Sequence, residues 1–153
     1  MSDLDALYRE LILDHSKHPQ HFGLADEGDA PAVAGTIGTS YQKNPVCGDE
    51  ITLRARVDGE TIADVQWEGR GCSISQASAS MLADLVAEEG LTRAEALQLV
   101  EGFREALRSR GTIELDEEVY GDAAALSGVS KFSARVKCAM LAWVALEDAI
   151  AKA

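Results

Sequence analysis

The chain has 153 residues, of which 46% are hydrophobic, and carries a formal net charge of −12 from 14 basic and 26 acidic side chains. This length predicts a single domain, residues 1–153, that is large enough to bury a core. The acidic balance argues against the basic surface that nucleic-acid binding requires, so we expect no nucleic-acid partner.

The sequence also lacks the signals that take a chain to or across a membrane. The first residues, MSDLDALYRE, are polar and acidic and contain no apolar stretch of a signal peptide. No apolar run approaches the roughly 20 residues needed to span a bilayer. The three cysteines are an odd number, which rules out a complete disulfide framework. We therefore expect a cytoplasmic protein with no membrane partner, whose thiols stay free, bind metal or do chemistry.

The first predicted element is a helix that ends before Pro19. Ser2 and Asp5 form a Ser/Thr-x-x-Asp/Glu helix start. Apolar residues from Leu4 to Ile12 then follow helical spacing. A loop rich in Gly, Ala, Asp and Pro is expected to follow, up to about residue 32.

Three histidines lie in DHSKHPQH at the end of this helix: His15, His18 and His21. His15 and His18 are three residues apart and could share a helical face, but Pro19 interrupts the helix before His21. We expect a solvated helix end here rather than a metal site. A surface for partner docking is the alternative.

A β region follows the loop. Residues 33–42 are predicted to form a first strand, weakened by glycine. In ITLRARV, residues 51–57, apolar and polar side chains alternate cleanly, and Asp58-Gly59 then predicts a tight hairpin turn. The chain returns in TIADVQWEG, where we expect Ala63, Val65 and Trp67 to share a face. These strands predict a three-stranded antiparallel meander with one face buried.

Helices are predicted for most of the remaining chain. The first has Ser73 or Ser75 as its cap and ends near Gly90. Thr92 and Glu95 form a capping box for the next.

Residues 111–128 are turn-rich, with one short helix, and a last helix runs from about Ser133 to the end. Strands followed by helices predict an α+β fold, with the helices packed on one face of a three-stranded antiparallel sheet.

Cys47, Cys72 and Cys138 each lie at the end of a predicted element, beside a glycine or a helix start, and Asp49 follows Cys47 by two residues. Because element ends meet at one edge of a small sheet, these four side chains are candidates for a shared metal site. Three thiolates and a carboxylate suit tetrahedral zinc, and the same set could hold an iron–sulfur cluster. From the residues alone, three buried cysteines remain the alternative, because no CxxC pair supports the site.

Two other chemistries do not fit the motifs. GRGCS lacks the Gly-Lys-Ser/Thr ending of a phosphate-binding loop. No pattern places a histidine beside a cysteine, as a Cys–His hydrolase would need.

Four segments together resemble the IscU/NifU N-terminal family of iron–sulfur assembly proteins, over nearly the whole chain. LYRELILDHSKHPQHFG is similar to the opening helix of the family, and NPVCGDEITL, EGRGCSISQASASML and RVKCAMLAW match its three cysteine motifs in order. Within the family the chain is most similar to the SufU group. IscU scaffolds carry a His immediately before the last cysteine, where this chain has Lys137, and SufU proteins carry an insertion that corresponds to the helix near residues 90–110.

The resemblance implies one zinc ion per chain, bound by Cys47, Asp49, Cys72 and Cys138. It implies that the chain is a sulfurtransferase that accepts persulfide sulfur from a SufS-type, PLP-dependent cysteine desulfurase and passes it to downstream iron–sulfur assembly proteins. A histidine of the desulfurase is expected to replace one zinc ligand and free Cys47 to attack the persulfide. The turn residues that flank Cys47 make it the best candidate for the moving ligand.

Arg135 precedes Cys138 by three residues and is a candidate for stabilising a thiolate or persulfide anion there. Its alternative role is a surface cation.

Two further functions remain open. The same four ligands could build a [2Fe–2S] cluster on a scaffold, although Lys137 argues against this, or they could form a structural zinc domain that binds partners without chemistry.

Overall fold

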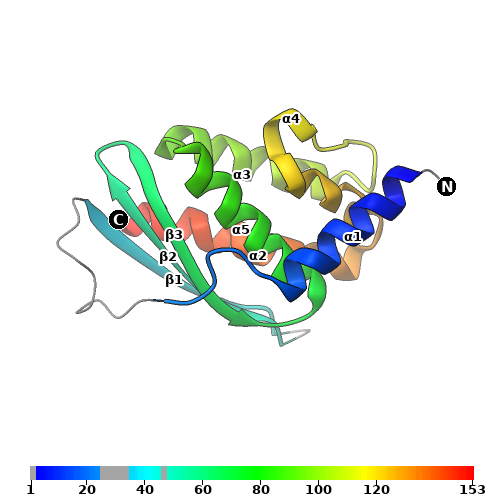
Figure 1. The fold of residues 1–153 in the computed structure, drawn as a ribbon, viewed down its shortest axis with the longest axis horizontal. Helices are drawn as coiled ribbons and strands as arrows, with labels where there is room; N and C mark the ends of the chain where they lie inside the picture. The colour runs from blue at the N-terminus through cyan, green and yellow to red at the C-terminus, as the bar shows by residue number, and fades with distance from the viewer. Residues whose placement is uncertain (1–2, 25–34, 46–47) are drawn as a thin grey trace.

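The computed structural model describes residues 3–24, 35–45 and 48–153. A three-stranded antiparallel sheet in the order β1-β2-β3 forms one layer, and helices cover one of its faces (Figure 1). The strands are β1 (Thr36–Lys43), β2 (Glu50–Asp58) and β3 (Thr61–Arg70). The helices are α1 (Asp3–Lys17), α2 (Ser73–Glu89), α3 (Arg93–Arg108), α4 (Glu117–Tyr120), the 3₁₀ helix η1 (Gly121–Lys131) and α5 (Ser133–Lys152). The predicted α+β class is therefore confirmed.

Strand β2 is the centre of the sheet and follows the predicted alternation. Its apolar residues Ile51, Leu53, Ala55 and Val57 are all buried against the helices. The intervening polar residues are only partly covered, as expected for a sheet with one solvated face. The predicted strand 33–42 is observed as β1, and residues 33 and 34 lie outside the described part of the chain. Much of the predicted loop before it, residues 25–32, also lies outside that part.

The prediction that Ala63 shares the buried face of β3 is wrong. Val57 pairs with Ile62 while Arg56 pairs with Asp64, so Ala63 is an extra residue on β3. Such a bulge reverses the alternation at that point. Ile62 therefore enters the core and Ala63 is exposed, whereas Val65 and Trp67 are buried as predicted.

Helix ends were predicted with mixed success. The capping box is present at α3: the Glu95 N–H donates to Thr92 Oγ1 and the Thr92 N–H donates to Glu95 Oε1, both at 3.1 Å. Gly90 closes α2 in a left-handed conformation. The cap of α2 is not Ser73 or Ser75 but Cys72, which provides no side-chain cap.

The turn-rich stretch 111–128 contains α4, as expected, but η1 was not predicted. Ser127 and Ser130 stabilise its three-residue repeat, because each hydroxyl donates to the carbonyl three residues earlier, both at 2.8 Å. Among the described residues no helix is both long and apolar enough to cross a membrane.

The helical layer contacts the sheet mainly through α5 and α2. Helix α5 packs on β1 and β2, and α2 packs on β3. Behind them, Phe103 of α3 stacks on Trp143 of α5, with ring centroids 3.8 Å apart and planes 6° from parallel. The Trp143 Nε1–H donates to Ser78 Oγ at 2.9 Å, so the buried indole keeps a hydrogen-bond partner. This stack joins three helices in the centre of the molecule.

Removing the Phe103 ring is expected to destabilise the fold strongly. Phe103 is fully buried, so Phe103→Ala should lower the free energy of unfolding by about 3–5 kcal/mol through lost burial and the cavity that remains. Denaturant unfolding measures this change. Leu97→Ala on the same helix is the control, because Leu97 is exposed, and its loss should be about 0.5 kcal/mol. Equal losses in the two variants would contradict the central role of the stack.

Candidate metal centre

Three of the four predicted metal ligands meet at one end of the sheet. One ligand atom from each of Asp49, Cys72 and Cys138 lies within 4.8 Å of those of the other two. Asp49 immediately precedes β2, Cys72 immediately precedes α2, and Cys138 lies in the second turn of α5. The fourth, Cys47, lies outside the described residues. The group therefore joins the sheet to two separate helices.

Asp49 is positioned by backbone hydrogen bonds with the residue that follows β1. The Asn44 N–H donates to the Asp49 carbonyl oxygen at 2.8 Å, and the Gly48 N–H donates to the Asn44 carbonyl oxygen at 2.8 Å. Gly48 has a φ of 76°, a left-handed conformation that glycine adopts without a steric penalty. Asp49 is buried at this position, with only 3% of the residue exposed.

The buried carboxylate of Asp49 is stabilised by the start of α2. The Cys72 N–H donates to Asp49 Oδ1 at 3.2 Å. The first N–H groups of a helix lack partners within the helix, and the helix dipole favours a negative charge at that end. Asp49 thus accepts from the N–H of Cys72, the residue just before α2, where the sequence predicts a capping serine. Ser75 instead donates to the Cys72 carbonyl oxygen at 3.0 Å.

Gly71 makes this approach sterically feasible. A Cβ atom at this position would lie 2.6 Å from Asp49 Oδ1 and would also clash with Ser75 Oγ. A glycine just before a helix often serves a sharp turn. The structure shows a different reason, since Gly71 does not have a left-handed φ. Glycine is needed at this position because the Asp49 carboxylate occupies the space where a side chain would lie.

Cys138 completes the group from the helical layer. It is 2% exposed, and its Sγ lies 4.0 Å from the Ala134 carbonyl oxygen one turn earlier in α5. Cys72 is partly exposed by contrast. The centre therefore has a buried side, formed by Asp49 and Cys138, and a side that opens toward solvent at Cys72.

The spacing of these atoms suits a tetrahedral ion. Zinc–sulfur bonds of about 2.3 Å and zinc–oxygen bonds of about 2.0–2.2 Å place neighbouring ligand atoms about 3.5–3.8 Å apart. The Cys72 Sγ lies 3.7 Å from Asp49 Oδ2. Thiolate and carboxylate donors are also ligands that zinc accepts. The described residues thus provide three converging donors that fit a metal.

Arg135, the other predicted site residue, lies three residues before Cys138 near the start of α5. Residues three apart on a helix lie on the same side. Arg135 is exposed, and within the described ranges its side chain makes no hydrogen bond or ion pair. Its role toward a sulfur anion stays a prediction.

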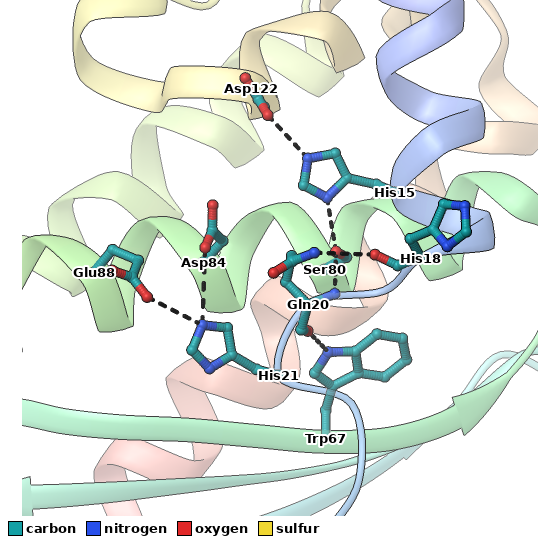
Figure 2. A network of polar contacts seen from close by, with 9 residues as sticks. All are labelled: His15, His18, Gln20, His21, Trp67, Ser80, Asp84, Glu88 and Asp122. Atoms are coloured by element: carbon teal, nitrogen blue, oxygen red, sulfur yellow. Dashed lines mark hydrogen bonds and ion pairs between the residues drawn. The ribbon is translucent and has the colours of Figure 1, made fainter.

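The three histidines do not converge, and the prediction of a solvated helix end is wrong for His15. His15 is buried, with Nδ1 2.7 Å from Ser80 Oγ and Nε2 2.9 Å from Asp122 Oδ2 (Figure 2). His18 is exposed as predicted. His21 faces α2 separately. His15 thus connects α1 to α2 and η1, a structural role that residue type and spacing in the sequence did not indicate.

The chain is similar to one family model and to several named proteins. A family model described as the NifU-like N-terminal domain matches residues 7–139. A Bacillus subtilis protein named zinc-dependent sulfurtransferase SufU is 40% identical, over 99% of this chain and 94% of that protein. A Streptococcus pyogenes protein named iron–sulfur cluster assembly scaffold protein IscU is 39% identical, over 98% of this chain and 86% of that protein.

A solved structure has a similar fold. It is described as a putative iron–sulfur cluster assembly scaffold protein for the SUF system from Fervidobacterium islandicum. Its TM-score is 0.77 at 34% sequence identity, and the match covers 92% of this chain and 94% of that one.

A methyl group at Gly71 is expected to push Asp49 away from α2. Gly71→Ala should lower the free energy of unfolding by about 1–3 kcal/mol, the usual cost of overpacking, and should weaken metal binding. Denaturant unfolding and metal retention on dialysis measure the two effects. Gly128→Ala is the matched control, because no atom beyond its chain neighbours and local helix backbone lies within 4 Å of the point that a Cβ atom would occupy there. If Gly71→Ala behaved like this control, the close approach would have no energetic importance.

Proposed function

The chain belongs to the family of NifU-like N-terminal domains, and from this premise we propose that it is a zinc-dependent sulfurtransferase of iron–sulfur cluster assembly. In this role it accepts persulfide sulfur from a SufS-type, PLP-dependent cysteine desulfurase and passes it to downstream assembly proteins. The convergence of Asp49, Cys72 and Cys138 carries the proposal. The similarity of the chain, over nearly its full length, to a protein named for zinc-dependent sulfur transfer supports the proposal.

We propose that Cys47, Asp49, Cys72 and Cys138 hold one zinc ion per chain. Cys47 precedes Asp49 by two residues, so chain connectivity keeps its Cα within about 7 Å of that of Asp49. Bound zinc would keep the cysteines as thiolates while lowering their reactivity toward other electrophiles. The chain itself contributes a buried carboxylate, already held by the Cys72 N–H, and a rigid helical position for Cys138. These two positions do not need to move for sulfur transfer.

Cys47 is the proposed sulfur acceptor because its neighbours face solvent. Pro45 and Gly48 are both exposed, so a partner protein can approach this turn. The Cys47 thiolate attacks the outer sulfur of the desulfurase cysteine persulfide, a new S–S bond forms on Cys47, and the desulfurase cysteine leaves as a thiolate. Arg135 is proposed to stabilise the anionic sulfur near Cys138. We place this chemistry in the cytoplasm, where thiols remain reduced.

A second function, assembly of a [2Fe–2S] cluster on the same ligands, is favoured by the names of other relatives. The Streptococcus pyogenes relative is named a scaffold at nearly the same identity. Against this, Lys137 precedes Cys138, and its side chain is exposed. Lysine is a poor metal ligand while it is protonated, so this position adds no further donor to a cluster. We therefore place sulfur transfer first.

The metal that the protein carries separates the two functions. Untagged protein purified without oxygen is expected to contain about one zinc per chain after dialysis, with no visible absorbance, because zinc has a filled d shell. Elemental mass spectrometry and an absorbance spectrum measure this. Iron with sulfide and a brown colour would contradict sulfur transfer in favour of the scaffold.

Variants of the carboxylate test the ligand set in the same measurement. Asp49→Asn should lose zinc on dialysis, whereas Asp58→Asn, at the exposed other end of β2, should retain it. Equal zinc in both variants would exclude Asp49 as a ligand.

Loss of the Cys47 thiol is expected to abolish sulfur acceptance. With a SufS-type desulfurase and cysteine supplied, Cys47→Ala should show no stimulation of cysteine turnover, because the nucleophile for the persulfide is gone. Sulfide release and mass spectrometry of the intact chain follow turnover and persulfide formation. An unchanged thermal unfolding curve would show that the variant is folded. Full stimulation by folded Cys47→Ala would overturn the proposed role.

A further inference from the structure

His21, Asp84 and Glu88 form a second group of side chains that could hold a metal ion, apart from the candidate metal centre of Asp49, Cys72 and Cys138 (the thiolate centre). We propose that they bind a divalent transition-metal ion such as zinc in an exchangeable site. The three side chains offer ligand atoms that lie within 4.8 Å of one another. His21 comes from the segment after α1, and both carboxylates come from α2 (Figure 2). This site goes beyond sulfur transfer and does not depend on it.

The geometry of the group leaves room for an ion. His21 Nε2 lies 3.8 Å from Asp84 Oδ1 and 3.7 Å from Glu88 Oε1. Both distances exceed the 2.7–3.2 Å range of an N–H···O hydrogen bond. The imidazole nitrogen therefore faces two carboxylate oxygens without a hydrogen bond to either. Asp84 and Glu88 are four residues apart, so they project from the same face of α2 on successive turns.

The donor types suit zinc. A neutral imidazole and carboxylates bind zinc at about 2.0–2.2 Å, which places the ligand atoms of a tetrahedral site about 3.3–3.5 Å apart. The observed separations are a few tenths of an ångström longer. The side chains of Asp84 and Glu88 are 42% and 69% exposed, so small rotations can close this difference. Water would fill the remaining coordination position.

The position of the His21 imidazole is fixed by hydrogen bonds of the backbone at His21 and at the residues on either side. The Trp67 N–H donates to the His21 carbonyl oxygen at 3.2 Å, and the Gly23 N–H donates to the Trp67 carbonyl oxygen at 2.7 Å. Just before His21, the Gln20 N–H donates to Ser80 Oγ at 2.7 Å, and the Gln20 carbonyl oxygen accepts from Trp67 Nε1–H at 2.9 Å (Figure 2). The segment is thus tied to β3 and to α2. Such preorganisation reduces the ordering cost of binding.

The two metal-binding groups lie toward opposite ends of α2. Cys72 lies immediately before α2, and Asp84 lies within the helix, 12 residues after Cys72 (84 − 72). This separation corresponds to a rise of about 18 Å along the helix at 1.5 Å per residue. The His21 group has no thiolate, and it draws both carboxylates from the C-terminal half of the helix, where a cation is favoured by the helix dipole. It should hold zinc more weakly than the thiolate centre. Zinc at this site would be lost on dialysis, and it would raise the metal content above one per chain when free zinc is present.

Titration of zinc-loaded protein with further zinc ion tests this site by calorimetry. The thiolate centre is filled and dialysed first, so only additional binding is measured. The wild-type chain should bind about one further zinc per chain. His21→Gln should weaken that binding at least about tenfold, the scale of effect seen when a metal site loses a supporting group. His18→Gln is the matched control, because His18 is exposed and its ring points away from the carboxylates (Figure 2).

A second matched pair tests the carboxylates on α2. Glu88→Gln should weaken the additional binding, whereas Glu89→Gln, at the next position of the helix and likewise exposed, should leave it unchanged. Thermal unfolding verifies that all variants are folded. Absence of a further zinc in the wild-type chain, or equal loss in variants and controls, would overturn the proposal. The thiolate centre is the same in the wild-type chain and in every variant. The differences in additional zinc binding therefore do not depend on which metal or reaction that centre supports.

Discussion

The contact between the Asp49 carboxylate and the start of α2 is the constraint on which the candidate metal centre depends. It buries a charged group at the edge of the sheet, and the Cys72 N–H and the helix terminus offset that cost. The same contact fixes where β2 begins relative to α2. It also leaves no room for a side chain at Gly71. The position of Cys72 relative to Asp49 is therefore set by the packing of the fold, before any metal binds.

Helix α2 links the parts of the molecule because the first half of the helix buries only alanine and serine residues, before the larger Met81, Leu82 and Val86. Ser78 accepts from the buried indole of Trp143 and donates to the Ala139 carbonyl oxygen, which ties α2 to α5. Ser80 bonds both His15 and Gln20, which ties α2 to α1 and the segment after it. Small side chains let neighbouring helices approach closely, and the hydroxyl groups satisfy the polar atoms that this approach buries.

The chemistry available at the thiolate centre follows from its uneven burial. Asp49 and Cys138 are enclosed, whereas Cys72 is partly exposed and the turn beside Asp49 faces solvent at Pro45 and Gly48. A fully enclosed site would suit a structural ion. An opening on one side instead leaves a cysteine accessible from solvent, which the proposed group transfer requires. The second group on α2 differs in kind, since its nitrogen and oxygen donors are more exposed and lack thiolate.

The sequence by itself determined the features that depend on neighbouring residues. The alternation in β2 and the Thr92–Glu95 capping box were predicted from local patterns, and the cysteine motifs indicated the family. Tertiary structure decided what depends on contacts between distant segments. The bulge at Ala63, the burial of His15 and the need for glycine at Gly71 each follow from a partner that is far away in sequence. A periodic pattern indicates which face of a helix or strand a residue occupies. It does not indicate which atom of another segment will lie opposite, because the packing of the layers decides this contact.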